Sequence, residues 1–258
     1  MTDLRFDKKK VYIEDMAAVT PDTLLISNRM KKRVQLLDRR KGWILCKVKL
    51  QEYPGRMCLA DRNTAAVCVG VDKIQMIQVE DKTLTLCGVV TVGKYVLGIT
   101  SSRKTLVVSY RKKPWLEKVS MDGKVLKQFD MKGNPQHFHS PGFMCTTPDG
   151  SVFISDCGTQ MITQVDASLN ILQTFTSPLL DVPCGIIAVM EDQILVCSYS
   201  RENQSIVLLQ PSTNTMSTLL GRGDEIYLPY SLTYCPHEKK LFVKSDTINK
   251  VIRVYHIA

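Results

Sequence analysis

The chain has 258 residues, of which 44% are hydrophobic, and its 34 Lys and Arg against 25 Asp and Glu give a formal net charge of +9. This hydrophobic fraction is sufficient for a globular core. No apolar run reaches 18 residues and the first ten residues lack the apolar centre of a secretory signal, so the sequence excludes a transmembrane helix and predicts no signal peptide.

Nine cysteines are present, an odd number, and none forms a Cys-x-x-Cys pair. Most of them fall within or beside predicted strands. This pattern is typical of reduced and largely buried thiols rather than of a disulfide framework. The pattern predicts a cytosolic or nuclear protein, and of these we expect a cytoplasmic one.

A short apolar segment recurs along the chain and sets its organisation. Its six copies are TLLIS from Thr23, TAAVC from Thr64, TLVVS from Thr105, SVFIS from Ser151, QILVC from Gln193 and KLFVK from Lys240. Each follows a polar turn and precedes a further apolar segment, such as RVQLLD at 33–38. β-branched residues between Gly, Pro, Asp and Asn clusters are typical of short strands. Six such units at intervals of 41–47 residues predict an all-β fold, a six-bladed β-propeller of four-stranded antiparallel blades.

We predict a single domain over residues 1–258. The expected blades occupy 14–50, 56–90, 95–131, 141–176, 183–221 and 229–258 together with 2–8. The sixth unit has only three strands before Ala258, and an open sheet edge is prone to aggregation. We therefore predict that Leu4 to Asp7 supply its fourth strand, so that the two ends of the chain pair and close the ring.

The charge is segregated between the two halves of the ring. Residues 1–132 contain 27 Lys and Arg and 14 Asp and Glu, whereas residues 133–258 contain 7 and 11. Such segregation produces a directional field and indicates an anionic partner. In a propeller, the connections between second and third strands and those between blades emerge on one face. We call this the basic face, because the loops of blades one to three bring most of the Lys and Arg to it. On the opposite face, Arg39, Arg40 and Lys41 are predicted to be balanced by acids.

The basic face is the predicted nucleic-acid-binding site. Its predicted residues are Arg29, Lys31, Lys32, Arg33, Arg56, Lys94, Tyr110, Arg111, Lys112, Lys113, Lys132 and His137. Cations of this kind bind phosphates, and aromatic residues that accompany them, such as Tyr53 and Tyr95, stack on unpaired bases. The alternative is that the cations only solvate the surface and that Tyr110 and Trp115 pack between blades.

Two segments carry residue types that bind metals. His137 and His139 would face the same side of a strand, as a metal pair does, but no third ligand can be placed beside them, and polar residues of a Pro-rich connection are the favoured interpretation. Asp156 ends a second strand, where some propellers place calcium ligands, but Val69, Tyr110 and Ser198 occupy the equivalent positions of other blades. We expect Asp156 to accept backbone hydrogen bonds in its own loop instead. No metal, cofactor or catalytic residue is predicted, and we expect the domain not to be an enzyme.

The segment from Ser140 to Phe175, SPGFMCTTPDGSVFISDCGTQMITQVDASLNILQTF, resembles the NHL repeat. A blade of that family runs from a Pro-Gly opening through a turn such as Pro-Asp-Gly to an apolar strand that ends in Asp. The segment RVQLLD at 33–38 resembles the third strand of such a blade. The whole chain is similar to the C-terminal NHL or NHL-like propeller of tripartite-motif (TRIM) proteins. That resemblance implies a recognition domain for RNA or a protein, with E3 ubiquitin ligase activity supplied by RING and B-box modules that are not in this sequence. It also implies that RNA binds the basic face.

Two functions remain open. One is binding of single-stranded or stem-loop RNA by the basic face. The other is recruitment of an acidic protein partner, either a ubiquitination substrate or a signalling protein, without nucleic acid. The combination of cations and aromatic residues slightly favours RNA. In either case we expect no membrane partner and a monomeric domain.

Overall fold

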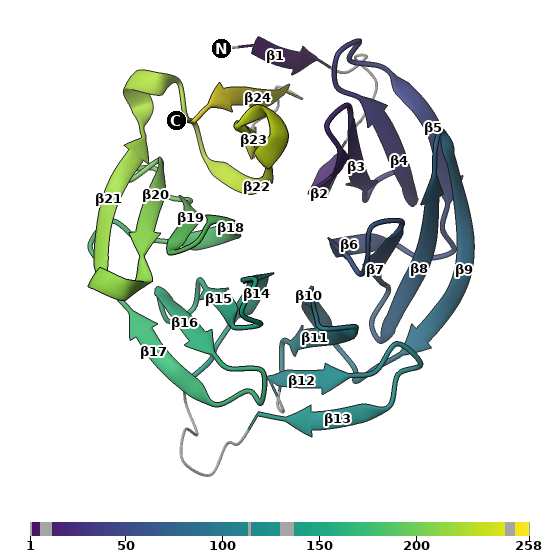
Figure 1. The fold of residues 1–258 in the computed structure, drawn as a ribbon, viewed down its shortest axis with the longest axis horizontal. Coiled ribbons are helices and arrows are strands. Elements are labelled where there is room, and N and C mark those ends of the chain that lie inside the picture. The colour runs from purple at the N-terminus through teal and green to yellow at the C-terminus, as the bar shows by residue number, and fades with distance from the viewer. Residues whose placement is uncertain (1, 6–11, 113–114, 130–136, 246–250, 258) are drawn as a thin grey trace.

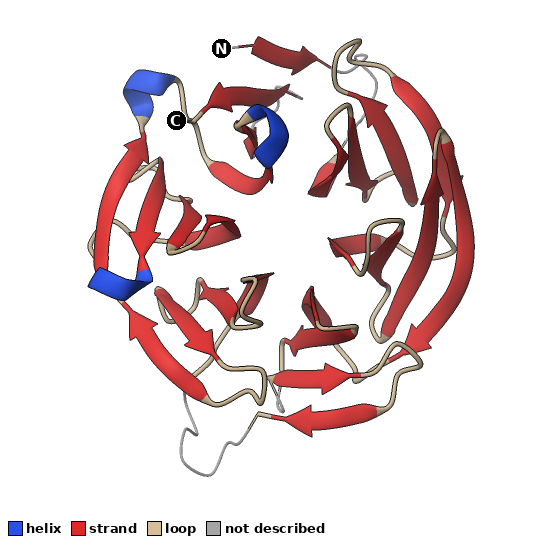
Figure 2. Ribbon diagram, viewed as in Figure 1, coloured by secondary structure: helices blue, strands red, loops and turns tan. Residues whose placement is uncertain are grey.

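A computed structural model of the protein describes residues 2–5, 12–112, 115–129, 137–245 and 251–257. Six four-stranded antiparallel sheets stand around a common axis, which confirms the predicted all-β six-bladed propeller (Figure 1). Three single-turn 3-10 helices lie in connections, as Figure 2 shows: η1 (Pro211–Thr213), η2 (Arg222–Asp224) and η3 (Pro236–Glu238). Among the described residues, no helix is long and apolar enough to cross a membrane.

The strands follow the chain from the ring axis outwards in each of the first five blades. Blade one contains β2 (Ile13–Thr20), β3 (Thr23–Asn28), β4 (Arg33–Asp38) and β5 (Ile44–Lys49). Blade two contains β6 (Pro54–Leu59), β7 (Thr64–Val69), β8 (Lys73–Glu80) and β9 (Thr83–Thr91). Blade three contains β10 (Val96–Ser102), β11 (Thr105–Tyr110), β12 (Leu116–Val119) and β13 (Val125–Gln128). Blade four contains β14 (Pro141–Thr146), β15 (Val152–Asp156), β16 (Met161–Val165) and β17 (Ile171–Phe175). Blade five contains β18 (Pro183–Met190), β19 (Gln193–Ser198), β20 (Ser205–Gln210) and β21 (Thr215–Leu220).

The sixth blade is built from both ends of the chain. It contains β22 (Pro229–Cys235), β23 (Lys240–Ser245), β24 (Val251–His256) and, at the rim, β1 (Thr2–Arg5). In the antiparallel pairing of β1 with β24, Thr2 lies opposite Val254 and Leu4 opposite Ile252. The predicted closure is confirmed for Leu4 and Arg5, whereas positions 6 and 7 of the predicted strand lie outside the described residues.

The second strand of each blade is the most buried because a neighbouring blade covers each of its faces. All residues of β3, β7, β11 and β19 after the first are buried, which explains why the repeat that marks them is a continuous apolar run. Outer strands are exposed, and none of the four residues of β13 is buried. Burial therefore decreases from the second strand towards the rim.

Six clusters of buried apolar side chains are found, one at each interface between neighbouring blades. Leu25 and Val67 belong to the cluster between blades one and two, and Phe242 packs with Ile26 where blade six meets blade one. Stacking of blades thus supplies the hydrophobic core that a single sheet lacks.

Hydroxyl groups near the ends of second strands also join neighbouring blades. The Oγ of Ser27 donates to the carbonyl oxygen of Gly55 at 3.0 Å, Ser109 donates to Pro141 at 2.5 Å, and Ser155 donates to Cys184 at 2.5 Å. Each acceptor lies on the inner strand of the following blade. These bonds satisfy buried polar groups close to the axis.

Candidate nucleic-acid interface

In blades one to four, the first residue after the second strand lies at the mouth of the ring on the basic face. In three of the first four blades this residue donates its backbone N–H to the residue that precedes the inner strand. Arg29 donates to Tyr12 at 3.0 Å, Gly70 to Tyr53 at 3.2 Å and Arg111 to Tyr95 at 2.9 Å. These three hydrogen bonds hold the connection that follows the second strand beside the segment that leads into the inner strand. They also show that Tyr12, Tyr53 and Tyr95 occupy equivalent positions in blades one, two and three.

The three tyrosines are exposed. Their exposed fractions are 40% for Tyr12, 51% for Tyr53 and 43% for Tyr95. The sequence pointed to Tyr53 and Tyr95 as aromatic companions of the cations but missed Tyr12. The shared position immediately before the inner strand is the signal that would have identified all three.

Each of these rings has a cationic group over it. The Nζ of Lys32 lies 4.5 Å from the centroid of the Tyr53 ring, and the guanidinium carbon of Arg29 lies 5.9 Å from it. The Nζ of Lys112 lies 4.8 Å from the Tyr95 ring, and that of Lys244 lies 5.4 Å from the Tyr12 ring. Cation–π contacts of this length hold the lysine and arginine side chains beside the rings.

Apart from Arg56, the predicted cations divide into three groups. Arg29, Lys94, Arg111 and Lys112 are exposed, and Lys31, Lys32 and Arg33 are half-buried. Lys113 and Lys132 lie outside the described residues. The Nε of Arg33 donates to the side-chain oxygen of Gln35 at 3.1 Å, so this arginine is partly engaged within blade one. The exposed members, together with Lys31 and Lys32, form a basic surface over blades one to three.

Tyr110 does not belong to the interface. It ends β11, where neighbouring blades cover both faces, and it is 0% exposed. Its hydroxyl donates to Glu117 Oε2 at 2.6 Å and accepts from the backbone N–H of Gly93 at 3.2 Å. Burial, with the bond to Glu117, raises the pKa of the phenol. The prediction that Tyr110 contacts nucleic acid is therefore corrected, and the alternative of packing between blades holds for this residue.

His137 packs against the protein rather than projecting from it. Its ring lies 4.8 Å from that of Phe138 between centroids, and its Nε2 is 2.9 Å from the hydroxyl of Thr163. Partial burial lowers the pKa of the imidazole below its usual value, so the ring is neutral at pH 7 and adds no charge to the basic face. Phe138, the next residue along the chain, is fully buried.

Arg56 lies at the ring axis, not on the surface, which corrects its predicted place among the surface cations. It is 7% exposed, and its guanidinium carbon lies 3.6 Å from the centroid of Phe143 and 4.7 Å from that of Tyr230. It donates to the Tyr230 hydroxyl at 2.6 Å and forms an ion pair of 3.3 Å with Glu14 Oε1. Arg56, Phe143 and Tyr230 come from blades two, four and six and meet in one cluster, which we call the axial plug.

The axial plug depends on an irregularity of the inner strands. In each of the six inner strands the pairing register shifts near the start, so that one or more residues are added. Arg56 and Tyr230 fall within these shifts and Phe143 follows one directly. Such bulges redirect side chains out of the regular alternation of a strand. Sequence alone gave no sign of which residue each bulge would turn towards the axis.

A cavity of about 250 Å³ opens beside the axial plug on the basic face. Arg29, Gly70, Arg111 and Cys157, the first residues after the second strands of blades one to four, all line it. Arg56, Glu14 and Tyr230 are also part of its lining. Blade two contributes Gly70 at the equivalent position, and the carboxylate of Glu52, which forms an ion pair of 2.7 Å with Lys73, occupies the space that a side chain there would take. The structure thus brings these two predicted residues to one cavity.

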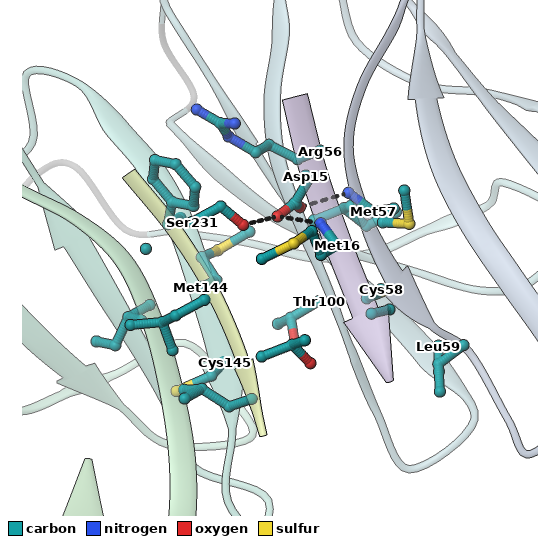
Figure 3. Close-up of a pocket in the computed structure, with 18 of the residues that line it drawn as sticks. Asp15, Met16, Arg56, Met57, Cys58, Leu59, Thr100, Met144, Cys145 and Ser231 are labelled. Atoms are coloured by element: carbon teal, nitrogen blue, oxygen red, sulfur yellow. Dashed lines mark hydrogen bonds between the residues drawn. The ribbon is translucent and has the colours of Figure 1, made fainter. Parts of the chain in front are cut away.

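A second cavity of about 340 Å³ lies along the axis and also has Arg56 in its lining (Figure 3). Asp15 lies in its wall and joins three blades. One of its carboxylate oxygens accepts from Met16 N at 2.9 Å and from the Ser231 hydroxyl at 2.7 Å, and the other accepts from Met57 N at 2.9 Å. Burial raises the pKa of this carboxyl. Many of the labelled side chains around it carry methyl or sulfur groups, including Met144 and Cys145.

The opposite face is balanced by ion pairs. Arg40 Nε lies 2.6 Å from Asp22, and Arg39 and Lys240 lie 2.9 Å and 2.7 Å from the same oxygen of Glu238. These two bonds hold the pKa of Glu238 far below its usual value, at about 2, with Lys240 the larger cause. The predicted balance by acids is therefore confirmed for Arg39 and Arg40, whereas Lys41 forms no ion pair with a described residue.

Asp156 accepts backbone hydrogen bonds, as predicted. Its carboxylate receives the N–H groups of His139 at 2.7 Å, Ser140 at 2.8 Å, Gly158 at 2.8 Å and Thr159 at 3.1 Å. In the described parts of the chain, no three His, Cys, Asp or Glu side chains gather as a metal site.

Comparison with known proteins shows the fold. No protein-family model and no curated protein sequence matches the chain. A protein of unknown function from Bacteroides thetaiotaomicron superposes with a TM-score of 0.76 at 16% identity, covering 99% of this chain and 72% of that one. An inactive virginiamycin B lyase from Staphylococcus aureus with quinupristin gives 0.69 at 12% identity, covering 98% and 87%. Hydrazine synthase from Kuenenia stuttgartiensis gives 0.69 at 15% identity, covering 93% and 74%. At these identities the shared feature is the propeller.

Proposed function

We propose that this propeller is a recognition domain that binds single-stranded RNA across its basic face. One observation carries the proposal: Tyr12, Tyr53 and Tyr95 occupy equivalent positions in three consecutive blades and each has a cation beside its exposed ring. Proteins that bind single strands combine such stacking rings with cations that follow the phosphates.

The exposure of the tyrosine rings supports a single strand as ligand. An unpaired base has a free face that stacks on a tyrosine ring, whereas in a duplex the base faces are covered by their neighbours. The cations of the same loops lie where the phosphates of a stacked strand pass. The basic half of the propeller thus carries exposed aromatic side chains and positive charges together.

The resemblance of blade four to the NHL repeat supports a further step of the proposal. The Asp that ends the strand in that repeat is Asp156, and its carboxylate holds four backbone N–H groups of two loops. This structural role accounts for the residue type that the repeat requires there. We infer that the propeller is the targeting domain of a TRIM-type E3 ubiquitin ligase whose catalytic modules are encoded elsewhere. None of the nine cysteines, all of which lie among the described residues, forms a disulfide, and this supports a reducing compartment such as the cytoplasm.

Fluorescence anisotropy with labelled oligoribonucleotides of about ten nucleotides tests RNA binding. We expect binding of single strands that weakens steeply with salt, and weaker binding of a duplex of the same sequence. Absence of binding at about 50 mM salt would refute the proposal. Duplex binding as tight as that of single strands, unaffected by tyrosine substitutions, would refute the stacking role.

Recruitment of a protein is the second candidate, and a different surface favours it. Leu86 and Val89 of β9 and Val125 and Leu126 of β13 are between 42% and 54% exposed on the outer strands of blades two and three. Exposed apolar side chains that form a contiguous patch are typical of protein contacts. The double variant Leu86→Ser with Leu126→Ser tests this surface. Loss of a bound protein partner without loss of RNA binding would assign the rim to protein recruitment.

A further inference from the structure

The cavity beside the axial plug is closed at its inner end. Arg56, Phe143 and Tyr230 project from alternate blades and contact one another across the axis, with Phe143 and Tyr230 5.4 Å apart between ring centroids. A polymer that enters from the basic face therefore cannot pass through the ring at this level. Only a chain end or a small molecule reaches the inner part of the cavity.

The lining of this cavity carries excess positive charge. Three arginines, Arg29, Arg56 and Arg111, line it together with one carboxylate, Glu14, which is ion-paired with Arg56. Within the described part of the chain, neither Arg29 nor Arg111 forms an ion pair. The cavity therefore presents about two uncompensated guanidinium charges to whatever enters it.

A phosphate monoester matches this charge. It carries about −1.5 to −2 charges at pH 7 and three acceptor oxygens, and arginine binds such a group with two parallel hydrogen bonds. An internal phosphodiester carries one charge and is continued by the chain on both sides, so it does not fit a closed cavity. The chemistry and the shape both favour a terminal phosphate.

We propose that the cavity beside the axial plug, the mouth cavity, binds a terminal phosphate monoester, presented by the end of an RNA strand or by a free mononucleotide, between Arg29 and Arg111. For the strand end, the proposal rests on the RNA binding proposed above. The tyrosines then hold the adjoining nucleotides, and the cavity anchors the end of the strand. The domain distinguishes a phosphorylated end from a hydroxyl end.

Cys157 gives a direct readout of this cavity. It is exposed and lines the cavity, whereas Cys87, also exposed, lies on the outer strand β9. Alkylation of both thiols of the wild-type protein is followed by mass spectrometry. We expect an oligoribonucleotide with a 5′-phosphate to slow alkylation of Cys157 at least about tenfold and to leave Cys87 unchanged. The same strand with a 5′-hydroxyl should bind by anisotropy without protecting Cys157.

Uridine 5′-monophosphate separates the two sources of the phosphate. Protection of Cys157 by both the mononucleotide and the phosphorylated strand supports a site for the shared group, and protection by only one of them assigns its source. If no RNA binds but the mononucleotide protects, the proposed RNA function fails and the cavity proposal stands. Equal protection by phosphorylated and hydroxyl strands, or no protection by either phosphate source, overturns the cavity proposal.

A glycine substitution fills the cavity without removing a charge. Gly142 lines the cavity, its φ is outside the left-handed region, and a Cβ there would meet only the carbonyl oxygen of Ser140, at 3.8 Å. Gly142→Leu should abolish the preference for the phosphorylated strand, which we expect to be about 10- to 100-fold in the wild type, and should retain binding of the hydroxyl strand. Gly88→Leu on β9 is the matched control, because a Cβ at Gly88 meets nothing within 4 Å. An unchanged preference in Gly142→Leu would contradict the proposal.

Discussion

Neutralising two lysines of the basic face should reduce the salt dependence of RNA binding by a calculable amount. Lys31 and Lys112 lie in equivalent connections of blades one and three, and no ion pair with a described residue involves either. The double variant Lys31→Gln and Lys112→Gln removes two charges and leaves the arginines of the mouth cavity intact. Each phosphate contact with a single strand contributes about 0.7 to the slope of log K against log salt.

The exposed and half-buried cations described on the basic face give a reference slope for the wild type. They are Arg29, Lys31, Lys32, Arg33, Lys94, Arg111 and Lys112. If all of them contact phosphates, the slope is about −4.9, and the affinity falls about 900-fold between about 50 and about 200 mM salt. In the double variant the slope should be about −3.5, and the same change of salt should lower the affinity about 130-fold.

Anisotropy titrations at four or more salt concentrations give this slope directly. Lys82→Gln and Lys124→Gln form the control, because both side chains are exposed in turns between third and fourth strands on the opposite face. The control carries the same change of net charge and should keep the wild-type slope. An equal reduction in both double variants would show that overall charge, not the basic face, determines binding, and would refute the reasoning.

Three further predictions concern the rings, the closure and the axis. Tyr53→Ala and Tyr95→Ala should each weaken RNA binding about 5- to 150-fold, whereas Phe at either position should bind RNA almost as tightly as the wild type. Exposed Tyr227, on the acidic half, provides the control, and an equal effect of Tyr227→Ala would argue against the assignment. Deleting residues 1–5 removes β1 from the edge of β24 and should lower the melting temperature by several degrees, because each 1 kcal/mol lost from the free energy of unfolding corresponds to about 2–4 °C in a chain of this size. An unchanged melting curve would contradict the closure. Burial raises the pKa of Asp15, so the folded state binds this proton more tightly than the unfolded state and the free energy of unfolding falls as the pH rises above 3.8. In urea unfolding between about pH 4 and about pH 7, Asp15→Asn should flatten this pH dependence, and an unaltered dependence would count against the prediction.

The sequence by itself determined the fold, because the repeated apolar segment reflects the burial of each second strand on both of its faces. Second strands such as β3 and β15 are covered on both faces, so they must be continuously apolar, and the turn residues before them must be polar. The incomplete sixth unit likewise required a strand from elsewhere, and β1 supplies it. The uneven charge of the two halves could be assigned to one face because propeller connections alternate regularly between faces.

Only the tertiary structure decided which residues of that face are accessible. Tyr110 and Tyr95 are both aromatic residues beside basic loops, yet Tyr110 ends a strand between two blades and is buried, whereas Tyr95 precedes an inner strand and is exposed. Arg56 falls in a bulge that turns it towards the axis, where Phe143 and Tyr230 from distant parts of the chain enclose it. Burial and side-chain direction at these positions depend on neighbouring blades and on register shifts. Residues far apart in the sequence impose both at Tyr110 and Arg56, so no local pattern reveals that these two residues are buried.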